Sequence, residues 1–290
     1  MDTIAQKTEN QSWDLEIKPK SGLFELNMKE VWAYRDLMWL FVRRDFVAQY
    51  KQTVLGPLWH FIQPILTTIM FLFVFGRIAR IPTDGIKPEF LFYLSGITIW
   101  NYFSTCLTST STTFTSNAHI FGKVYFPRLV LPLSIVISNL IKFGIQLLFL
   151  FIAMIYAYLS GYSITINTSI LLIPFLLIIM AGIGLGLGII ISSVTTKYRD
   201  FAILISFAIQ LYMYATPIAY PLSYLKEKGY AWIVEINPLT PVVEAFRFAL
   251  FGQGSFTIGS LFYSTMFMTI IFFIGAIMFQ KVEKTFMDTV

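Results

Sequence analysis

The fold is decided by the stretch from Thr195 to Arg247, TTKYRDFAILISFAIQLYMYATPIAYPLSYLKEKGYAWIVEINPLTPVVEAFR. A short polar loop opens it, and the apolar run that follows is broken at Pro217 and again at Pro238 and Pro241. A helix that simply crosses a membrane needs no such breaks. Short, interrupted segments are typical of backbone that dips into a membrane, and such backbone is tolerated only where protein or water satisfies its polar groups. We therefore expect this stretch to line a transport pathway.

Composition places the chain in a membrane. Of its 290 residues, 56% are hydrophobic and only 13% are charged, with a mean hydropathy of +0.69, whereas soluble domains carry about 25% charged residues. The net charge of +5 is concentrated on particular loops, so we expect no nucleic-acid partner. Residues 1–22 are polar and mixed in charge, which predicts a cytosolic tail and not a signal peptide. The single cysteine, Cys106, permits no internal disulfide.

Six apolar stretches approach the roughly 20 residues that a helix needs to cross the hydrocarbon core. They cover 58–75, 90–111, 131–159, 170–194, 201–218 and 258–279. Outside them, fourteen Lys and Arg residues lie on the side of the two termini and six on the other. Because positive charge is retained in the cytosol, we predict an all-α integral membrane protein with six transmembrane helices and both termini cytosolic.

A different pattern precedes the first span, in residues 23–54. Charged residues recur there at spacings of seven or eight and share one helical face: Lys29, Asp36, Arg43 and Lys51. Apolar residues cover the rest of this helix, which is therefore expected to lie along the membrane interface. The residues alone leave two interpretations open. Either this helix serves only as an inert membrane anchor, or it also forms a docking surface on the cytosolic side. Residues 55–290 would form the six-span domain.

Small residues and missing motifs narrow the function. Gly182, Gly184, Gly186 and Gly188 form two interleaved GxxxG pairs, a pattern typical of close helix packing in membranes. The sequence contains no GxxxxGK[ST] stretch, so we expect no nucleotide to be bound through a P-loop of this chain. Neither histidine has acidic or cysteine neighbours at ligand spacing, and we predict no catalytic residues and no metal site.

Few charges fall inside the apolar stretches. Lys142 lies well inside the third one, where an ionisable group is a functional candidate; alternatively, its long side chain simply reaches the interface. Glu244 and Arg247 are three residues apart and can pair on one helix face. We expect that pair to have mainly a structural role within the broken segment.

Aromatic residues make up 17% of the chain. Most are expected to face lipid or to form interfacial belts, but two groups are candidates for lining the pathway: Trp100, Tyr102 and Phe103 in the second span, and Tyr212 and Tyr214 in the fifth. Tyrosine at such depth needs a hydrogen-bond partner or a wet cavity. Aromatic faces and hydroxyls with almost no charge suit a long neutral or amphipathic molecule such as a glycan.

Short motifs in four stretches of the chain, in this order and spacing, resemble one family. They are RRD at 43–45, LGPLW at 55–59, FPRLVLPL at 126–133, YRD at 198–200, TPIAYP at 216–221 and NPLTP at 237–241. Together with Glu244 and Arg247 they are similar to the membrane permease subunit of type-2 (ABC-2) ABC exporters for polysaccharides, the group that exports O-antigen, capsule and teichoic-acid chains. The resemblance covers about 43–252 and leaves the polar tail outside.

The resemblance implies partners and a location. The chain would form a homodimer with two copies of a separate ABC ATPase subunit, which would bind the ATP and Mg; this chain would bind no cofactor. The substrate would be an undecaprenyl-pyrophosphate-linked glycan, and the protein would be a multi-pass protein of the bacterial cytoplasmic (inner) membrane. The residues implied in coupling to the ATPase are Arg43, Arg44, Phe121, Lys123, Tyr125, Phe126 and Arg128.

The resemblance also implies a gate at the outer end, formed by a re-entrant helical segment before the last span. The residues expected in it are Pro217, Pro221, Pro238, Pro241, Glu244 and Arg247. At the cytosolic entrance, Lys123, Arg128 and Arg199 would attract the diphosphate of the substrate. These three are alternatively ordinary positive residues of cytosolic loops.

Three other functions are alternatives to export of a polysaccharide. A type-2 ABC exporter of a small amphipathic drug or lipid is the main alternative. A membrane enzyme acting on polyprenyl lipids would need an interfacial cluster of acidic residues or histidines, and none is evident. An ion-coupled flippase would be expected to show internal repeats and a membrane-buried carboxylate, which the sequence does not clearly show.

Overall fold

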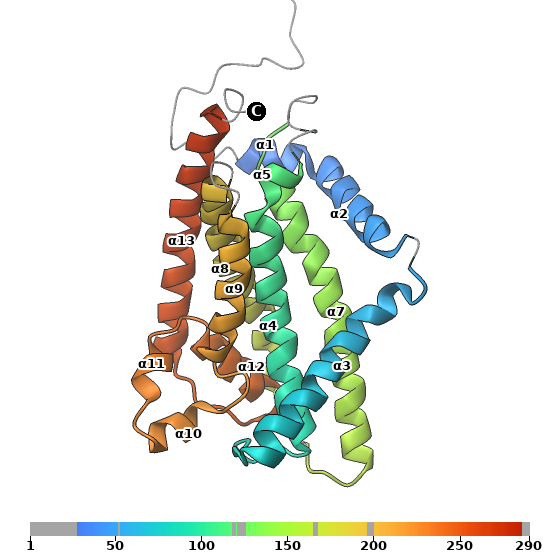
Figure 1. Cartoon of the computed structure of the whole chain (residues 1–290), viewed down its shortest axis with the longest axis vertical. Helices are drawn as coiled ribbons and strands as arrows, with labels where there is room; N and C mark the ends of the chain where they lie inside the picture. Colours follow the sequence, from blue (N-terminus) through green and yellow to red (C-terminus); the bar gives the residue numbers. More distant parts are fainter. Residues whose placement is uncertain are drawn as a thin grey trace, which may run out of the picture.

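The computed structural model describes residues 28–51, 53–117, 120, 126–164, 168–195 and 200–285. Every regular element in these ranges is a helix. Four long helices run roughly along the long axis of the molecule (Figure 1): α4 (Glu89–Ser111), α7 (Val130–Leu159), α8 (Ile173–Thr195) and α13 (Ile258–Thr285). Helix α3 (Trp59–Phe71), with its π-helical continuation η2 (Leu72–Ile78), crosses them obliquely. The predicted all-α class is confirmed for the described residues.

Within the part of the chain that the structure describes, four helices are long and apolar enough to cross a membrane: Trp59–Ile78, Val130–Leu159, Thr168–Thr195 and Ile258–Phe279. The other two predicted spans differ in kind. Helix α4 has the length but carries polar residues such as Ser95 and Asn101, which lower its hydropathy. Helix α9 (Phe201–Tyr214) has 14 residues and therefore measures about 21 Å, less than the hydrocarbon core of about 30 Å.

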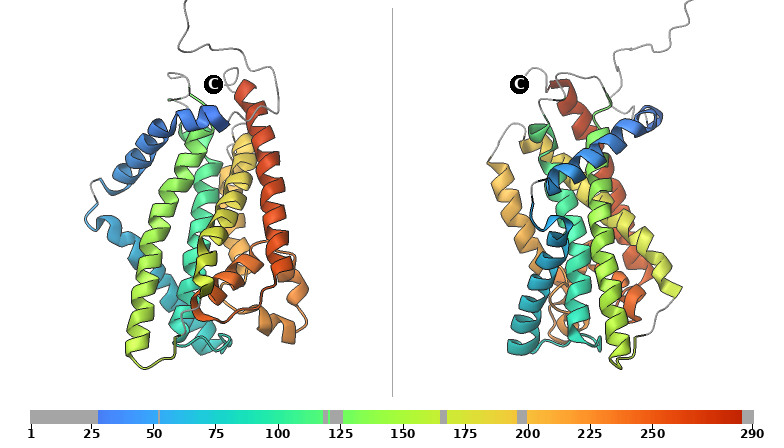
Figure 2. Two further views of the ribbon diagram at one scale, coloured as in Figure 1. Left: turned by 180° about the vertical axis from the view of Figure 1, so that it is seen from behind. Right: turned by 90° about the vertical axis from the view of Figure 1, so that its right-hand side faces the viewer.

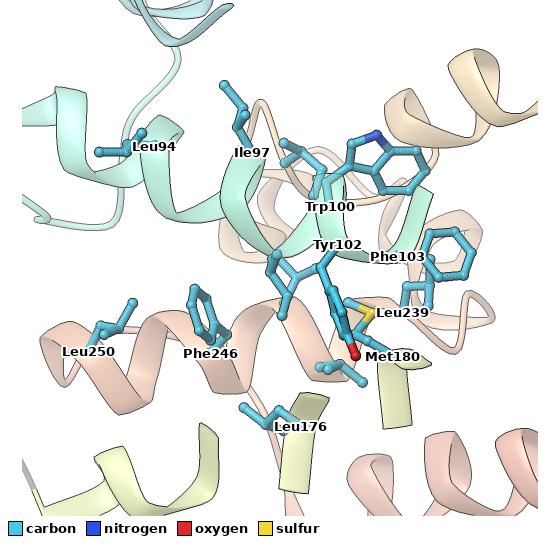
Figure 3. Close-up of a cluster of buried hydrophobic side chains, with 14 of the residues drawn as sticks. Leu94, Ile97, Trp100, Tyr102, Phe103, Leu176, Met180, Leu239, Phe246 and Leu250 are labelled. Atoms are coloured by element: carbon cyan, nitrogen blue, oxygen red, sulfur yellow. The ribbon is translucent and has the colours of Figure 1, made fainter. Parts of the chain in front are cut away.

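Helix α4 forms the centre of the bundle. It packs against α7 and α8, and α8 packs in turn against α13. Most residues of α4 are buried, and Figure 3 shows its Leu94 and Ile97 in one apolar cluster with Leu176 of α8 and Phe246 of α12 (Thr240–Phe251). Because other helices pack on α4, its polar residues Ser95 and Thr98 are buried in protein, whereas Thr105 and Thr108 are exposed.

The four glycines of α8 face two different neighbours. A Cβ at Gly184 would lie 3.1 Å from the Cβ of Cys106 on α4, and one at Gly188 would lie 2.6 Å from the Cβ of Thr110. The other pair faces α13, where a Cβ at Gly186 would lie 2.9 Å from the backbone nitrogen of Phe272. Each GxxxG pair therefore lets one neighbouring helix approach closely, which confirms the predicted packing role.

The amphipathic segment forms two helices, α1 (Met28–Ala33) and α2 (Arg35–Tyr50), with a break at Tyr34. They lie at the same end of the bundle as the C-terminal part of α13 (Figure 2, blue and red). Phe41 and Val42 are buried against the bundle, whereas Trp39 keeps 62% of its surface exposed. One face thus docks on α7, and exposed tryptophan is typical of a membrane interface.

Candidate functional site

The backbone is broken between α9 and the last long helix. Helix α9 ends at Tyr214, and three short helices follow: α10 (Leu222–Glu227), α11 (Ala231–Glu235) and α12 (Thr240–Phe251). They lie at the end of the molecule opposite α1 and α2 (Figure 1). A helix end leaves carbonyl groups without partners, and these must be satisfied where water is scarce.

Arg247 of α12 binds two carbonyls of the turn that follows α9. Its Nη1 donates to the Pro217 carbonyl at 2.6 Å, and its Nη2 donates to the Ile218 carbonyl at 2.8 Å. The guanidinium carbon lies 3.7 Å from the centroid of the Phe92 ring on α4, close enough for a cation–π contact. With 1% of its surface exposed, Arg247 links α12, α4 and the broken backbone.

Glu244 compensates the buried charge. Its Oε1 lies 3.4 Å from Nη1 of Arg247, and its Oε2 accepts a hydrogen bond from the Ser255 backbone nitrogen at 2.9 Å. Both side chains are 1% exposed, which confirms the predicted pair. Space for the guanidinium comes from Gly96 of α4, because a Cβ at that position would lie 2.8 Å from Nη2.

Asn237 makes a second connection to the end of α9. Its Oδ1 accepts hydrogen bonds from the Tyr212 hydroxyl at 2.6 Å and from the Leu239 backbone nitrogen at 2.9 Å. Its Nδ2 donates to the Ala215 carbonyl and to the Thr216 hydroxyl, both at 2.9 Å. The amide therefore uses all of its donor and acceptor capacity and joins α9 to the start of α12.

Asn237→Ala is expected to lower the free energy of unfolding by about 2 kcal/mol, because it leaves the part-buried Tyr212 hydroxyl and Ala215 carbonyl without a partner. The measurement is denaturant unfolding of the purified chain in mixed micelles. Asn101→Ala is the matched control, since the Asn101 side chain makes only a 3.5 Å bond to Gln146. Equal stability of the two variants would contradict the role of Asn237.

The predicted gate residues come together at this broken end. The Pro217 carbonyl is bound by Arg247, and the Pro238 carbonyl accepts a 2.7 Å hydrogen bond from Ser264 of α13. Pro221 directly precedes α10, and Pro241 is in the first turn of α12. All four prolines are buried. The structure thus gathers the set, and its gating role stays a prediction.

The predicted pathway aromatics lie mostly inside the single chain. Trp100 and Phe103 of α4 pack around Tyr212, with ring centroids 6.0 and 6.1 Å away. Tyr102 points to the other side of α4 (Figure 3), where its ring centroid lies 5.3 Å from that of Phe143 on α7. Tyr214 is 52% exposed. Their role in lining a pathway stays a prediction.

The predicted coupling residues are only partly described. Arg43 is exposed, while Arg44 pairs with Asp45 at 2.8 Å and donates to Asn117 at 3.4 Å. Phe126 is buried, with its ring centroid 5.7 Å from that of Phe41, and Arg128 is half-buried just before α7. The remaining predicted residues of the cytosolic loops lie outside the described residues: Phe121, Lys123, Tyr125 and Arg199.

The sequence is similar to known transport proteins. Residues 36–251 match the family model described as "ABC-2 type transporter". A Klebsiella pneumoniae protein named "O-antigen export system permease protein RfbA" is 31% identical over 256 residues, which are 87% of this chain and 94% of that protein. A second protein of that name and organism is 30% identical with the same coverage, and one from Myxococcus xanthus is 28% identical over 76% of this chain and 82% of its own length.

Proposed function

Because this chain belongs to the ABC-2 type transporter family, we propose that it is the transmembrane subunit of an ATP-driven exporter of lipid-linked polysaccharide. The substrate class is O-antigen-like, and the membrane is the bacterial cytoplasmic membrane. The observation that carries the proposal is the similarity to three O-antigen export permeases along most of their length. The apolar helices of a multi-pass membrane protein support it.

We propose six crossings with both termini in the cytosol. Four come from the helices that are long and apolar enough, and α4 and α9 supply the other two, with α10–α12 as a re-entrant segment at the outer end. Two observations support this topology: the excess of Lys and Arg on the terminal side, and α1, α2 and the end of α13 lying together (Figure 2). Residues 1–22 would be a tail, 23–54 the interface segment and 55–290 the transport domain.

Energy would come from a separate subunit. Two copies of an ABC ATPase, which would hold the ATP and Mg, would dock on a homodimer of this chain. Membership of the ABC-2 family supports an ATPase partner, and the chain has no P-loop sequence of its own. The exposed Arg43 on α2 and the segment around Phe126 are the proposed docking and coupling surface.

The outer end would open and close as a unit. Asn237 attaches the start of α12 to the end of α9, and Arg247 attaches α12 to the turn that follows α9, so a displacement of one helix would carry the other with it. Aromatic side chains and tyrosine hydroxyls would then contact the glycan along the pathway. This arrangement would let ATP-driven movement of the cytosolic end reach the outer gate.

One observation favours the alternative substrate class, a small amphipathic drug or lipid. An apolar pocket of about 710 Å³ lies between α4 and α7, lined by residues that include Phe90, Phe149 and Tyr156. Pockets of roughly 300–1,000 Å³ accommodate drug-sized ligands. A glycan exporter has no evident need for this pocket, so substrate tests should include both classes.

The proposal is tested by purifying the chain with its ATPase subunit in lipid nanodiscs and measuring ATP hydrolysis. We expect the two proteins to assemble and hydrolysis to change when undecaprenyl-pyrophosphate-linked glycan is added. Undecaprenol alone and an ATPase subunit with an inactivated P-loop lysine are the controls. A response only to small amphipathic drugs would establish the alternative, and failure to bind any ABC ATPase would refute both.

A further inference from the structure

A polar pocket lies at the end of the bundle that carries α2. It has a volume of about 350 Å³ and is enclosed by α2, by the C-terminal part of α4 with α5 (Thr113–Ser116), and by α7. The residues of its wall that matter here are Arg44, Asp45, Asn117, Ser138, Asn139 and Lys142. Arg44 and Asp45 keep 39% and 31% of their side-chain surface exposed, so the pocket can be reached from outside.

The pocket carries positive charge at membrane depth. Lys142 lies twelve residues after the start of α7 at Val130, which is about 18 Å along the helix. Its ammonium donates to Asn139 Oδ1 at 3.1 Å, and no described carboxylate lies within 4 Å of it. Asp45 pairs with Arg44 at 2.8 Å and also attracts Lys142, so two cations and one carboxylate give this pocket wall a net positive charge. An ammonium in a membrane span normally has a counter-charge or a water-filled cavity.

A second group in the pocket lacks a partner. The hydroxyl of Ser138 is buried, with 4% of the residue exposed, and makes no hydrogen bond. Ser138 is one helical turn before Lys142, so both side chains project from the same face of α7 into the pocket. Leaving a buried hydroxyl unsatisfied costs free energy, and an acceptor placed in the pocket would meet both the hydroxyl and the ammonium.

We propose that this pocket binds the phosphate group of a membrane-anchored lipid, and specifically the diphosphate of the lipid-linked substrate. Phosphate oxygens accept hydrogen bonds from ammonium, guanidinium, hydroxyl and amide groups, and the wall supplies all four. A cation would be repelled by Lys142, and an uncharged sugar would leave that charge uncompensated. The inference rests on the proposed function for the identity of the lipid; the chemistry of the pocket is independent of it.

The test is lipid binding to the full-length chain, measured by native mass spectrometry. The probes are undecaprenyl diphosphate, undecaprenol, phosphatidylglycerol and inorganic pyrophosphate. We expect the diphosphate lipid to bind, with affinity about tenfold lower in Lys142→Met, because a hydrogen bond to a charged group is lost. Ser138→Ala should lower the affinity about threefold. Lys226→Met, at the opposite end of the molecule, and Ser206→Ala, on exposed α9, are the matched controls.

The probes separate the sources of the phosphate. Stronger binding of undecaprenyl diphosphate than of phosphatidylglycerol would assign the pocket to the substrate, and equal losses for both in Lys142→Met would assign it to lipid phosphate in general. Binding of undecaprenol as tight as that of the diphosphate, or unchanged binding in both pocket variants, would overturn the inference. Because no ATPase subunit is present, these results do not depend on whether the chain exports a polysaccharide.

Discussion

Replacing Arg247 by methionine is expected to lower the free energy of unfolding by about 3–5 kcal/mol, the usual cost of removing one partner of a buried ion pair. The variant would leave Glu244 charged and 1% exposed, and it would leave the Pro217 and Ile218 carbonyls without donors. Denaturant unfolding in mixed micelles measures the change. ATP hydrolysis by the assembled complex should respond less to the glycan, since only the Asn237 bonds would still attach the outer end to α9.

Two comparisons make this expectation specific. Lys226→Met removes a different ion pair, with Glu235 at 3.5 Å and both side chains about half exposed, and should cost less than about 1 kcal/mol. Arg247→Lys keeps the positive charge, but an ammonium lacks the planar guanidinium geometry that lets Arg247 donate to the Pro217 and Ile218 carbonyls together. The stability of this variant should therefore fall between those of the wild type and Arg247→Met. A Met variant as stable as the Lys226 control would disprove the structural role of Arg247.

Gly186→Val is expected to lower the free energy of unfolding by about 3 kcal/mol, at the upper end of the range for overpacking a core. A Cβ at Gly186 would lie 2.9 Å from the Phe272 backbone nitrogen, and the carbonyl of Gly186 itself lies 2.8 Å from the Cβ position of Gly275. Backbone cannot rotate away as a side chain can, so α8 and α13 would have to separate. Thermal unfolding followed by tryptophan fluorescence measures the loss.

The chain supplies controls for this second effect. A Cβ at Gly144 on α7 would have no neighbouring atom within 4 Å. Gly144→Ala should therefore be neutral or stabilising by up to about 1 kcal/mol, because alanine favours the helix. At Gly182 the nearest atom is the sulfur of the flexible Met268 side chain, which can move, so Gly182→Ala should cost less than Gly186→Val. If all three glycine variants behaved alike, the close approach of α8 and α13 would not explain the result.

Patterns local in sequence predicted much of the fold. The apolar stretches located the long helices, and the GxxxG spacing predicted close packing of α8. The three-residue spacing of Glu244 and Arg247 predicted their pair. Each of these three predictions concerns residues within a single helix, and backbone geometry fixes the spacing at which such residues share a face. The helix break at Tyr34 between α1 and α2 had no such signal, since neither glycine nor proline marks it.

Contacts between distant segments could not be predicted from the sequence. Arg247 binds carbonyls about thirty residues away, in space provided by Gly96. Every residue has a main-chain carbonyl, so the amino-acid sequence does not reveal which carbonyls accept hydrogen bonds from Arg247. The sequence shows Asn237 directly before Pro238. The four hydrogen bonds of its side chain, however, depend on where α9 ends, and the sequence does not reveal that position. The inward orientation of Trp100 and Tyr212 likewise depends on helix rotation, which neighbouring helices determine.

The close approach of α4, α8 and α13 divides the bundle mechanically. Glycines let α8 touch both neighbours almost backbone to backbone, so these three helices resist sliding and behave as one slab. Helix α9 is the opposite case, because Ile209 is its single buried residue. Its outer end is held by Asn237 and Arg247, and its other end is loosely packed. We therefore expect α9 to move relative to these three helices more readily than they move relative to one another, with its outer end carrying α12 along.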